Sequence, residues 1–161
     1  MVRDGDDAPD FTAPLANGDI EGFTLADHLD NGPVVLAFFP GAFSRVCTGE
    51  MRTIDERLDV YDAVGATVYG VSVDSPFALN AFREDNDLDF AFISDANREI
   101  IKEYDVSMDF EEMGLYGFAQ RAVFVIDDDG EVTYAWIGEP STEPDYDEVE
   151  AAAEAAAGTA A

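Results

Sequence analysis

Apolar positions follow one another closely in two segments that are separated by a stretch with helical spacing. Residues 34–39 are almost continuously apolar, as is typical of a strand that is covered on both faces of a sheet, and residues 66–73 predict a second strand. Between them, residues 44–64 carry apolar side chains at helical spacing, and Gly65 is a suitable C-terminal stop. The apolar stripe consists of Val46, Cys47, Met51, Ile54, Leu58 and Tyr61. The pattern therefore predicts a strand, a helix over residues 44–64 and a second strand.

Turn signals predict two β-hairpins, one in each half of the chain. The first turn is Asn17-Gly18, and the second is Asp127-Asp128-Asp129-Gly130. The predicted strands are residues 10–14 and 20–24 in the first hairpin, and residues 122–126 and 132–137 in the second.

Further helices and one short strand complete the predicted elements. Thr24 is suited to cap a short helix that ends near residue 30, and Pro76 suits the first turn of a helix over residues 75–86. A strand is predicted at residues 90–93 and a helix at about residues 96–104. From Asp145 the chain is rich in Glu and Ala, which predicts a helix that frays over residues 151–161.

The order of these elements predicts one domain over residues 1–161, with no internal repeat and no linker. Helices alternate with strands before a closing hairpin, which indicates an α/β sandwich with a central mixed β-sheet flanked by helices. The hairpin near residues 10–24 is then an N-terminal β-hairpin extension.

The charge of the chain restricts its partners. The sequence contains 36 acidic and 8 basic residues, for a formal net charge of −28. This balance argues against nucleic acid as a partner and disfavours anionic membrane surfaces. A folded core inside so acidic a surface is typical of proteins from halophiles, whose high salt screens the repulsion. An acidic protein from a mesophile is the alternative.

The single cysteine also limits the chemistry. One thiol excludes an intramolecular disulfide, a Cys-x-x-Cys redox pair and a cysteine-based zinc site. A reducing, cytoplasmic compartment fits this composition best. No apolar run approaches the roughly 20 residues that cross a bilayer, and residues 1–7 do not resemble a signal peptide.

The position of Cys47 indicates a reactive thiol. An apolar strand, a Pro40-Gly41 break and Ser44 precede it, so it falls in the first turn of the predicted helix. Free N–H groups and the helix dipole stabilise a thiolate at that place. The alternative is a buried structural thiol, since Cys47 shares a helical face with Met51 and free cysteine is often buried. The local sequence leaves the two alternatives about equal.

The segment around Cys47 resembles the Pro-x-x-x-Thr/Ser-x-x-Cys signature of the peroxiredoxins, which are thiol peroxidases with a thioredoxin-like fold. Pro40, Ser44 and Cys47 match this signature, and Arg121 at the start of a predicted strand is similar to the family's active-site arginine. The resemblance extends from about residue 10 to residue 136. It implies a thioredoxin-like fold and favours the reactive thiol.

Each of the other matched residues has a functional and an ordinary structural interpretation. The resemblance implies that Ser44 holds the peroxide, that Pro40 shields the thiolate and that Arg121 stabilises it. Structurally, Ser44 suits an N-cap that accepts an N–H from Val46 or Cys47, Pro40 ends a strand, and Arg121 is a surface charge. Glu50 is either a solvated helix residue or, as the resemblance implies, a partner that orients an arginine.

The resemblance implies a reaction that needs no metal or organic cofactor. The Cys47 thiolate attacks a peroxide, becomes a sulfenic acid and releases water or an alcohol. Arg52 stands five residues after Cys47, where one branch of the family has its resolving cysteine. The chain therefore resembles the one-cysteine type, which an external thiol or a redoxin regenerates. A homodimer is implied by the resemblance alone.

Three other functions remain open. A cysteine hydrolase or acyltransferase needs a base, and the only histidine, His28, lies far upstream in a polar segment. A peroxide sensor and a non-catalytic thioredoxin-fold interaction module would share the fold. The sequence does not separate a sensor from a peroxidase.

Overall fold

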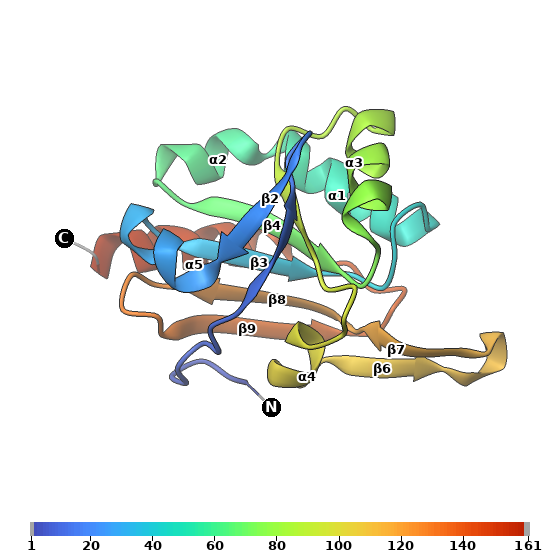
Figure 1. The fold of residues 1–161 in the computed structure, drawn as a ribbon. Coiled ribbons are helices and arrows are strands. Elements are labelled where there is room, and N and C mark those ends of the chain that lie inside the picture. Colours follow the sequence, from blue (N-terminus) through green and yellow to red (C-terminus); the bar gives the residue numbers. More distant parts are fainter. Residues whose placement is uncertain (1, 160–161) are drawn as a thin grey trace.

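A mixed seven-stranded sheet forms the centre of the computed structural model, which describes residues 2–159 (Figure 1). Its strand order is β2-β1-β5-β4-β3-β8-β9. The strands are β1 (Thr12–Ala16), β2 (Ile20–Thr24), β3 (Val34–Phe38), β4 (Thr67–Ser72), β5 (Ala91–Ser94), β8 (Arg121–Ile126) and β9 (Val132–Gly138). β3, β4 and β5 are parallel, whereas β1-β2 and β8-β9 are antiparallel hairpins at the two edges. Both hairpins and the mixed sheet predicted from the sequence are confirmed.

Helices cover both faces of this sheet. α1 (Arg45–Glu56), α2 (Leu58–Ala63), α3 (Pro76–Asp85) and α5 (Tyr146–Thr159) pack on one face, and η1 (Leu25–Asn31) and α4 (Ile100–Glu103) pack on the other. In β3, Val35 and Ala37 belong to the hydrophobic core under α1, α2, α3 and α5. Leu36 and Phe38 belong to the core on the other face, under η1 and α4. This alternation within a wholly buried strand is the reason for its continuous apolar run.

The helix predicted over residues 44–64 is interrupted. α1 ends at Glu56 and α2 begins at Leu58, and Arg57 between them has φ −109° and ψ 11°. The Arg57 N–H donates to the carbonyl of Ile54, three residues earlier, so the chain tightens before it turns helical again. The sequence signal for one continuous helix was therefore wrong at this position.

Two other helices differ from the predictions because side chains found different partners. Thr24 does not cap η1; its hydroxyl pairs with that of Thr12 across the hairpin, at 2.8 Å. The helix predicted over residues 96–104 is helical only from Ile100 to Glu103. Asp95 accepts the N–H groups of Ile100 and Ile101, at 3.0 and 2.9 Å, and so delays the start of this helix.

A two-stranded hairpin at residues 107–119 was not predicted. It consists of β6 (Ser107–Phe110), η2 (Glu111–Met113) and β7 (Leu115–Ala119), and we call it the arm. The arm projects from the body of the molecule (Figure 1, yellow). Gly114 (φ 69°) and Gly117 (φ 70°) have left-handed backbones, which break the strand pattern in the sequence.

The C-terminal helix is packed rather than frayed. α5 continues to Thr159, and Val149, Ala153 and Ala156 are buried against the core. The small alanine side chains let the helix lie close to the sheet. The fraying predicted from residue 151 is therefore wrong as far as Thr159, and residues 160 and 161 lie outside the described part.

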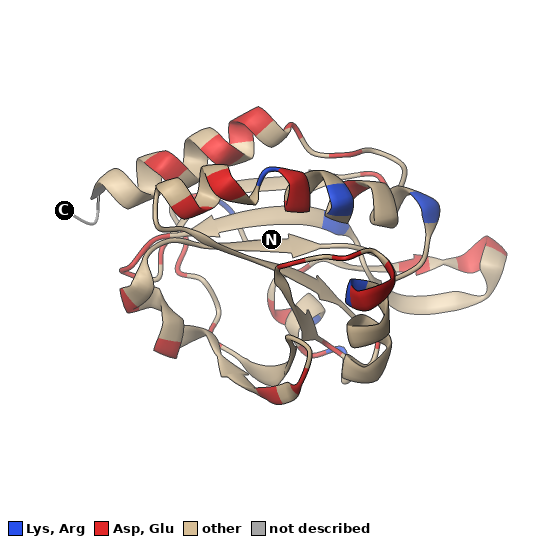
Figure 2. Ribbon diagram, turned by 90° about the horizontal axis from the view of Figure 1, so that it is seen from above, with Lys and Arg blue, Asp and Glu red and all other residues tan. Residues whose placement is uncertain are grey.

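Acidic residues are distributed over the helices and loops around the sheet rather than gathered in one place (Figure 2). The central strands are almost free of charge, apart from Arg121 at the start of β8. Among residues 2–159, no helix combines the length and the apolar character that a bilayer span requires.

Candidate functional site

Cys47 lies in the first turn of α1, directly after the loop that leaves β3. Its side chain is buried at 1% exposure, yet it lines a cavity of about 410 Å³. The remaining walls are Pro40, Gly41, Ser44, Arg45, Val46, Phe110, Met113, Leu115, Phe118, Arg121, Pro140 and Ser141. The cavity thus brings together Pro40, Ser44, Cys47 and Arg121, and its walls are largely apolar.

The loop before α1 is held by an acidic residue that the sequence analysis did not identify. The N–H of Ala42 donates to Oδ2 of Asp74 at 2.7 Å, and the Ser72 hydroxyl donates to the same oxygen at 2.6 Å. Phe43 has a left-handed backbone with φ 69°, and its ring contacts that of Phe82. A bulky residue in this conformation is strained, as often occurs beside functional sites.

Ser44 occupies the N-cap position of α1, but its side chain does not cap the helix. Its hydroxyl donates to the carbonyl of Gly41 at 3.0 Å. The expected hydrogen bond from Val46 or Cys47 is therefore wrong. The first turn of α1 contains no acidic residue. The helix N-terminus consequently keeps its positive potential for Cys47.

Arg121 is a buried residue at the bottom of the cavity, with 1% exposure. Its Nη2 donates to Sγ of Cys47 at 3.2 Å, and its Nη1 donates to Oε1 of Glu50 at 2.6 Å. Nε and Nη2 both donate to the carbonyl of Pro140, at 3.1 and 2.7 Å. These bonds use four of the five guanidinium hydrogens. The surface-charge interpretation of Arg121 is wrong.

Glu50 is completely buried, so the solvated interpretation is wrong and the contact with Arg121 is confirmed. Burial raises the pKa of Glu50 to about 7, although Arg121 acts in the opposite direction. Among the described residues, its second oxygen, Oε2, has no hydrogen-bond partner. Burial acts to lower the pKa of Arg121, but Glu50 and Cys47 raise it above its ordinary value.

The sequence analysis missed two groups of residues at this site. Phe110, Met113, Leu115 and Phe118 of the arm form one wall, and their short strands gave no clear pattern. The carbonyl of Pro140 is a main-chain group, so no side-chain motif identifies it as a partner of Arg121. Both groups come from segments distant in sequence from Cys47.

Other candidate residues lie outside the cavity. His28 stacks on Phe23, with ring centroids 4.4 Å apart, and it does not line the cavity. No base of the kind that a cysteine hydrolase needs therefore lies beside Cys47 in the described chain. Phe43 is 55% exposed and is not a wall residue, whereas Arg45 is an exposed residue at the rim.

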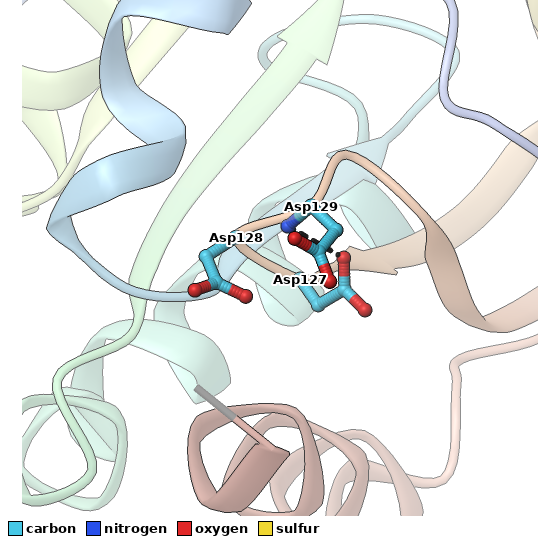
Figure 3. A group of neighbouring side chains, drawn as sticks. All are labelled: Asp127, Asp128 and Asp129. Carbon is cyan, nitrogen blue, oxygen red and sulfur yellow. Dashed lines mark hydrogen bonds between the residues drawn. The ribbon is translucent and has the colours of Figure 1, made fainter. Parts of the chain in front are cut away.

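Three adjacent carboxylates form the turn between β8 and β9, away from Arg121 at the other end of β8 (Figure 3). Oδ1 of Asp127 accepts the N–H groups of Asp129 and Glu131, at 3.0 and 2.9 Å. Asp128 and Asp129 are exposed. These bonds give Asp127 a structural role in the turn.

Comparison of the sequence with known proteins gives consistent matches. The sequence model of the AhpC/TSA family matches residues 5–135. A chloroplastic 2-cysteine peroxiredoxin of Chattonella marina var. antiqua is 32% identical over 155 residues, which are 91% of this chain and 76% of the relative. Alkyl hydroperoxide reductase C of Helicobacter pylori is 33% identical over 142 residues, or 82% of this chain and 69% of that protein.

Solved structures agree with this result. Peroxidoxin BcpB from Mycobacterium tuberculosis superimposes with a TM-score of 0.79 at 27% identity, over 99% of this chain and 97% of that chain. AhpC of Enterococcus faecalis has a TM-score of 0.86 at 22% identity, over 99% and 95% of the two chains, which shows a shared fold. The predicted thioredoxin-like fold is thus confirmed. The chain belongs to the AhpC/TSA family, the thiol-dependent peroxidases called peroxiredoxins.

Proposed function

We propose that Cys47 is the peroxidatic residue of this chain and that an external thiol regenerates it. The observation that carries this proposal is the 3.2 Å contact between Nη2 of Arg121 and Sγ of Cys47, at the bottom of an open cavity. A guanidinium at this distance stabilises a thiolate, which is the reactive form of a cysteine.

The reaction is a displacement at oxygen. The thiolate of Cys47 attacks the terminal oxygen of a hydroperoxide, an S–O bond forms and the O–O bond breaks. The leaving oxygen departs with the electron pair of the broken bond and takes up a proton as water or an alcohol. Cys47 is left as a sulfenic acid.

The neighbouring groups have complementary roles in this step. The Ser44 hydroxyl donates to Gly41, so its oxygen is free to accept the O–H of the peroxide. The remaining Nη1–H of Arg121 is available to the leaving oxygen, where negative charge develops. Pro40 forms part of the wall that limits water at the sulfur. Glu50 orients the guanidinium from the opposite side.

Turnover requires a thiol from another molecule, because this chain contains one cysteine. A first external thiol condenses with the sulfenic acid, which forms a mixed disulfide and releases water. A second thiol then reduces the mixed disulfide and restores Cys47. A small-molecule thiol and a redoxin both satisfy this stoichiometry.

The shape of the cavity supports organic hydroperoxides as substrates, in addition to hydrogen peroxide. A volume of about 410 Å³ is far larger than hydrogen peroxide needs, and four apolar side chains of the arm face it. They are Phe110, Met113, Leu115 and Phe118. A hydrocarbon substituent can contact these side chains while its O–O group lies at Cys47.

A peroxide sensor is the second candidate function, and it uses the same site. A sensor is oxidised once for each peroxide and passes its oxidation to a partner protein, whereas a peroxidase consumes excess peroxide when a thiol reductant is present. A non-catalytic interaction module would neither be oxidised once for each peroxide nor consume excess peroxide.

The surroundings proposed for this protein follow from its composition and its family. One cysteine suits a reducing cytoplasm, and the net charge of −28 suits high salt. A homodimer is proposed on the family resemblance, and the exposed rings of Phe43 (55%) and Phe77 (73%) are candidate contacts. Sedimentation equilibrium of wild type and Phe77→Glu tests the dimer.

Rapid-mixing fluorescence tests the proposed function, with Trp136 as the only indole. Trp136 is half-buried against the core that contains Cys47, so oxidation is expected to change its emission. Wild type should react with hydrogen peroxide and an alkyl hydroperoxide much faster than free cysteine, and Cys47→Ser should not react. A wild-type rate equal to that of free cysteine contradicts the proposal.

A further inference from the structure

We propose that residues 139–145, which we call the strap, position Arg121 for the reaction, and that Arg57 keeps the strap in place through α5. This inference rests on the proposed function. It assigns a positioning role to Arg57 and Tyr146, which lie outside the cavity walls.

The strap presents a main-chain carbonyl to Arg121. The N–H of Thr142 donates to the carbonyl of Glu139 at 3.0 Å, which closes a turn with Pro140 at its second position. The ring of Pro140 fixes its φ angle, and its carbonyl points away from the turn's own hydrogen bond. That carbonyl accepts from both Nε and Nη2 of Arg121.

This double acceptor determines the orientation of the guanidinium. One hydrogen of Nη2 is directed to Pro140 and the other to Sγ of Cys47. If the strap moved, Glu50 at Nη1 would be the one remaining anchor of the planar guanidinium apart from the reacting sulfur itself. Two anchors fix a planar fork, whereas one allows it to turn about that contact.

The strap begins directly beside Arg121. Gly138, the last residue of β9, is paired with Arg121 across the sheet. A Cβ atom at Gly138 would overlap the ring of Trp136, so this strand end is closely packed. The position of the strap at this end is therefore set by the sheet.

The other end of the strap is fixed by α5. The Tyr146 hydroxyl donates to Oε1 of Glu143 at 2.6 Å, and Pro144 is buried. α5 then follows with Val149 and Ala153 in the core. The strap is thus a short link between two packed elements.

Arg57 joins the start of α5 to the helix that carries Cys47. Its Nη2 donates to Oδ1 of Asp147 at 2.6 Å and to Oε1 of Glu150 at 3.0 Å. Its guanidinium also lies 5.7 Å from the centre of the Tyr146 ring. Because Arg57 directly follows α1, these contacts close a circuit from Cys47 through Arg121, the strap and α5 back to α1.

The experiment compares Arg57→Gln with Arg52→Gln, which makes the same charge change at an exposed residue of α1. For each protein, we measure the rate of Cys47 oxidation, the pH profile of alkylation by iodoacetamide and the free energy of unfolding. Arg57→Gln should slow oxidation by roughly three- to tenfold, well below the ~100-fold that a 1 Å misplacement costs. Its alkylation profile should shift to higher pH, and Arg52→Gln should match wild type.

A merely structural role for Arg57 predicts a different result, because lower stability alone does not move the alkylation profile of the folded protein. Equal rates and profiles for Arg57→Gln and wild type overturn the proposal, provided that wild type consumes peroxide. A wild type without peroxidase activity contradicts the proposed function instead, and the alkylation profiles then still test the strap.

A second variant decides the matter if Arg57→Gln does not fold. Tyr146→Phe removes one oxygen and leaves the ring against Arg57 in place, so the fold should persist. A slower oxidation together with a shifted alkylation profile supports the strap. An unchanged rate and profile overturn it. Arg57→Lys, which keeps the charge, should recover part of the wild-type rate.

Discussion

Arg121 and Glu50 form an ion pair of 2.6 Å in the interior, and both side chains are almost completely excluded from solvent. The pair joins β8 to α1 directly beneath the Cys47 cavity. Because burial raises the pKa of Glu50 to about 7, this carboxyl changes its charge near neutral pH. The electrostatic environment of Arg121 therefore depends on pH in the range where the protein is expected to act.

Glu50→Gln should change how stability depends on pH. The pKa of Glu50 is raised from 4.5 to about 7 in the folded protein, so between these values the folded state binds more protons than the unfolded state. The protonated Glu50 carboxyl therefore contributes fully to the free energy of unfolding below pH 4.5, and this contribution is lost as the pH rises through 7. The variant lacks this loss, so its free energy of unfolding relative to wild type should increase by about 2 kcal/mol from about pH 5 to about pH 8.

Chemical denaturation at a series of pH values measures this effect. Glu56→Gln is the matched control, since Glu56 is exposed in the same helix. If the two variants depend on pH in the same way, Glu50 is not the titrating group. Besides burial, which has the largest effect, Arg121 lowers the pKa of Glu50 and Glu143 raises it. Burial is also the main cause that raises the pKa of Tyr146, and Glu50 raises it further.

Arg121→Gln should slow the first oxidation of Cys47. The substitution removes the cation beside the sulfur and a donor to the leaving oxygen, which costs roughly 100-fold in comparable sites. The alkylation profile of Cys47 should also shift to higher pH. Stopped-flow kinetics measures the rate of Cys47 oxidation in Arg121→Gln and in the control Arg52→Gln, which makes the same charge change at the surface.

The same substitution leaves the Glu50 carboxylate buried without its cation, so some instability is expected. Measuring Arg121→Gln in a Glu50→Gln background separates the two effects, because a neutral pair avoids a buried unpaired charge. If the double variant oxidises as rapidly as wild type, Arg121 has no role in the reaction.

Leu115→Ser in the arm should affect organic hydroperoxides selectively. Leu115 lines the cavity, so a polar side chain there weakens contacts with a hydrocarbon group. We expect kcat/KM for an alkyl hydroperoxide to fall by about tenfold, as for a few lost apolar contacts, and the value for hydrogen peroxide to stay constant. Steady-state assays of both substrates make the comparison.

Tyr116→Ser provides the control for the arm, because Tyr116 lies in β7, is 61% exposed and does not line the cavity. Equal losses for the two peroxides in Leu115→Ser would indicate a general disturbance of the site rather than recognition of the substituent.

Ala153→Asp should strongly destabilise the fold, whereas Ala155→Asp should not. Ala153 has 0% exposure on the inner face of α5, and Ala155 is exposed on the same helix. An unpaired buried carboxylate costs roughly 3 kcal/mol or more, while an exposed change is usually within about 0.5 kcal/mol. Thermal unfolding of the two variants measures the difference. Equal midpoints would mean that α5 is frayed in solution, as the sequence suggested.

Added salt should stabilise the protein. At a net charge of −28 the acidic surface repels itself, and salt shortens the screening length from about 10 Å at 0.1 M to about 3 Å at 1 M. We expect the thermal midpoint to rise steeply over this range of KCl and to level off above it. Unfolding curves at increasing KCl test this, and a midpoint independent of salt contradicts the high-salt proposal.

Local signals in the sequence were sufficient for much of the fold and for the place of Cys47 in it. Asn17-Gly18 and the turn after Asp127 define hairpins, because turn chemistry acts within a few residues. The break after β3 placed Cys47 in the first turn of a helix for the same reason. Arg121 came from the family resemblance, since nothing in its own segment distinguishes a buried arginine from a surface one. The catalytic roles of Pro40, Ser44, Cys47 and Arg121 stay predictions.

Tertiary structure alone decided which partners these residues have. Asp74 fixes the loop at Ala42, and Arg57, between α1 and α2, binds Asp147, although each pair is far apart in sequence. The arm and the Pro140 carbonyl reach Cys47 only once the sheet has assembled. Sequence periodicity reports which face of an element is buried. The choice of hydrogen-bond partner depends instead on which distant groups the folded chain brings within about 3 Å, because hydrogen bonds act only at that range.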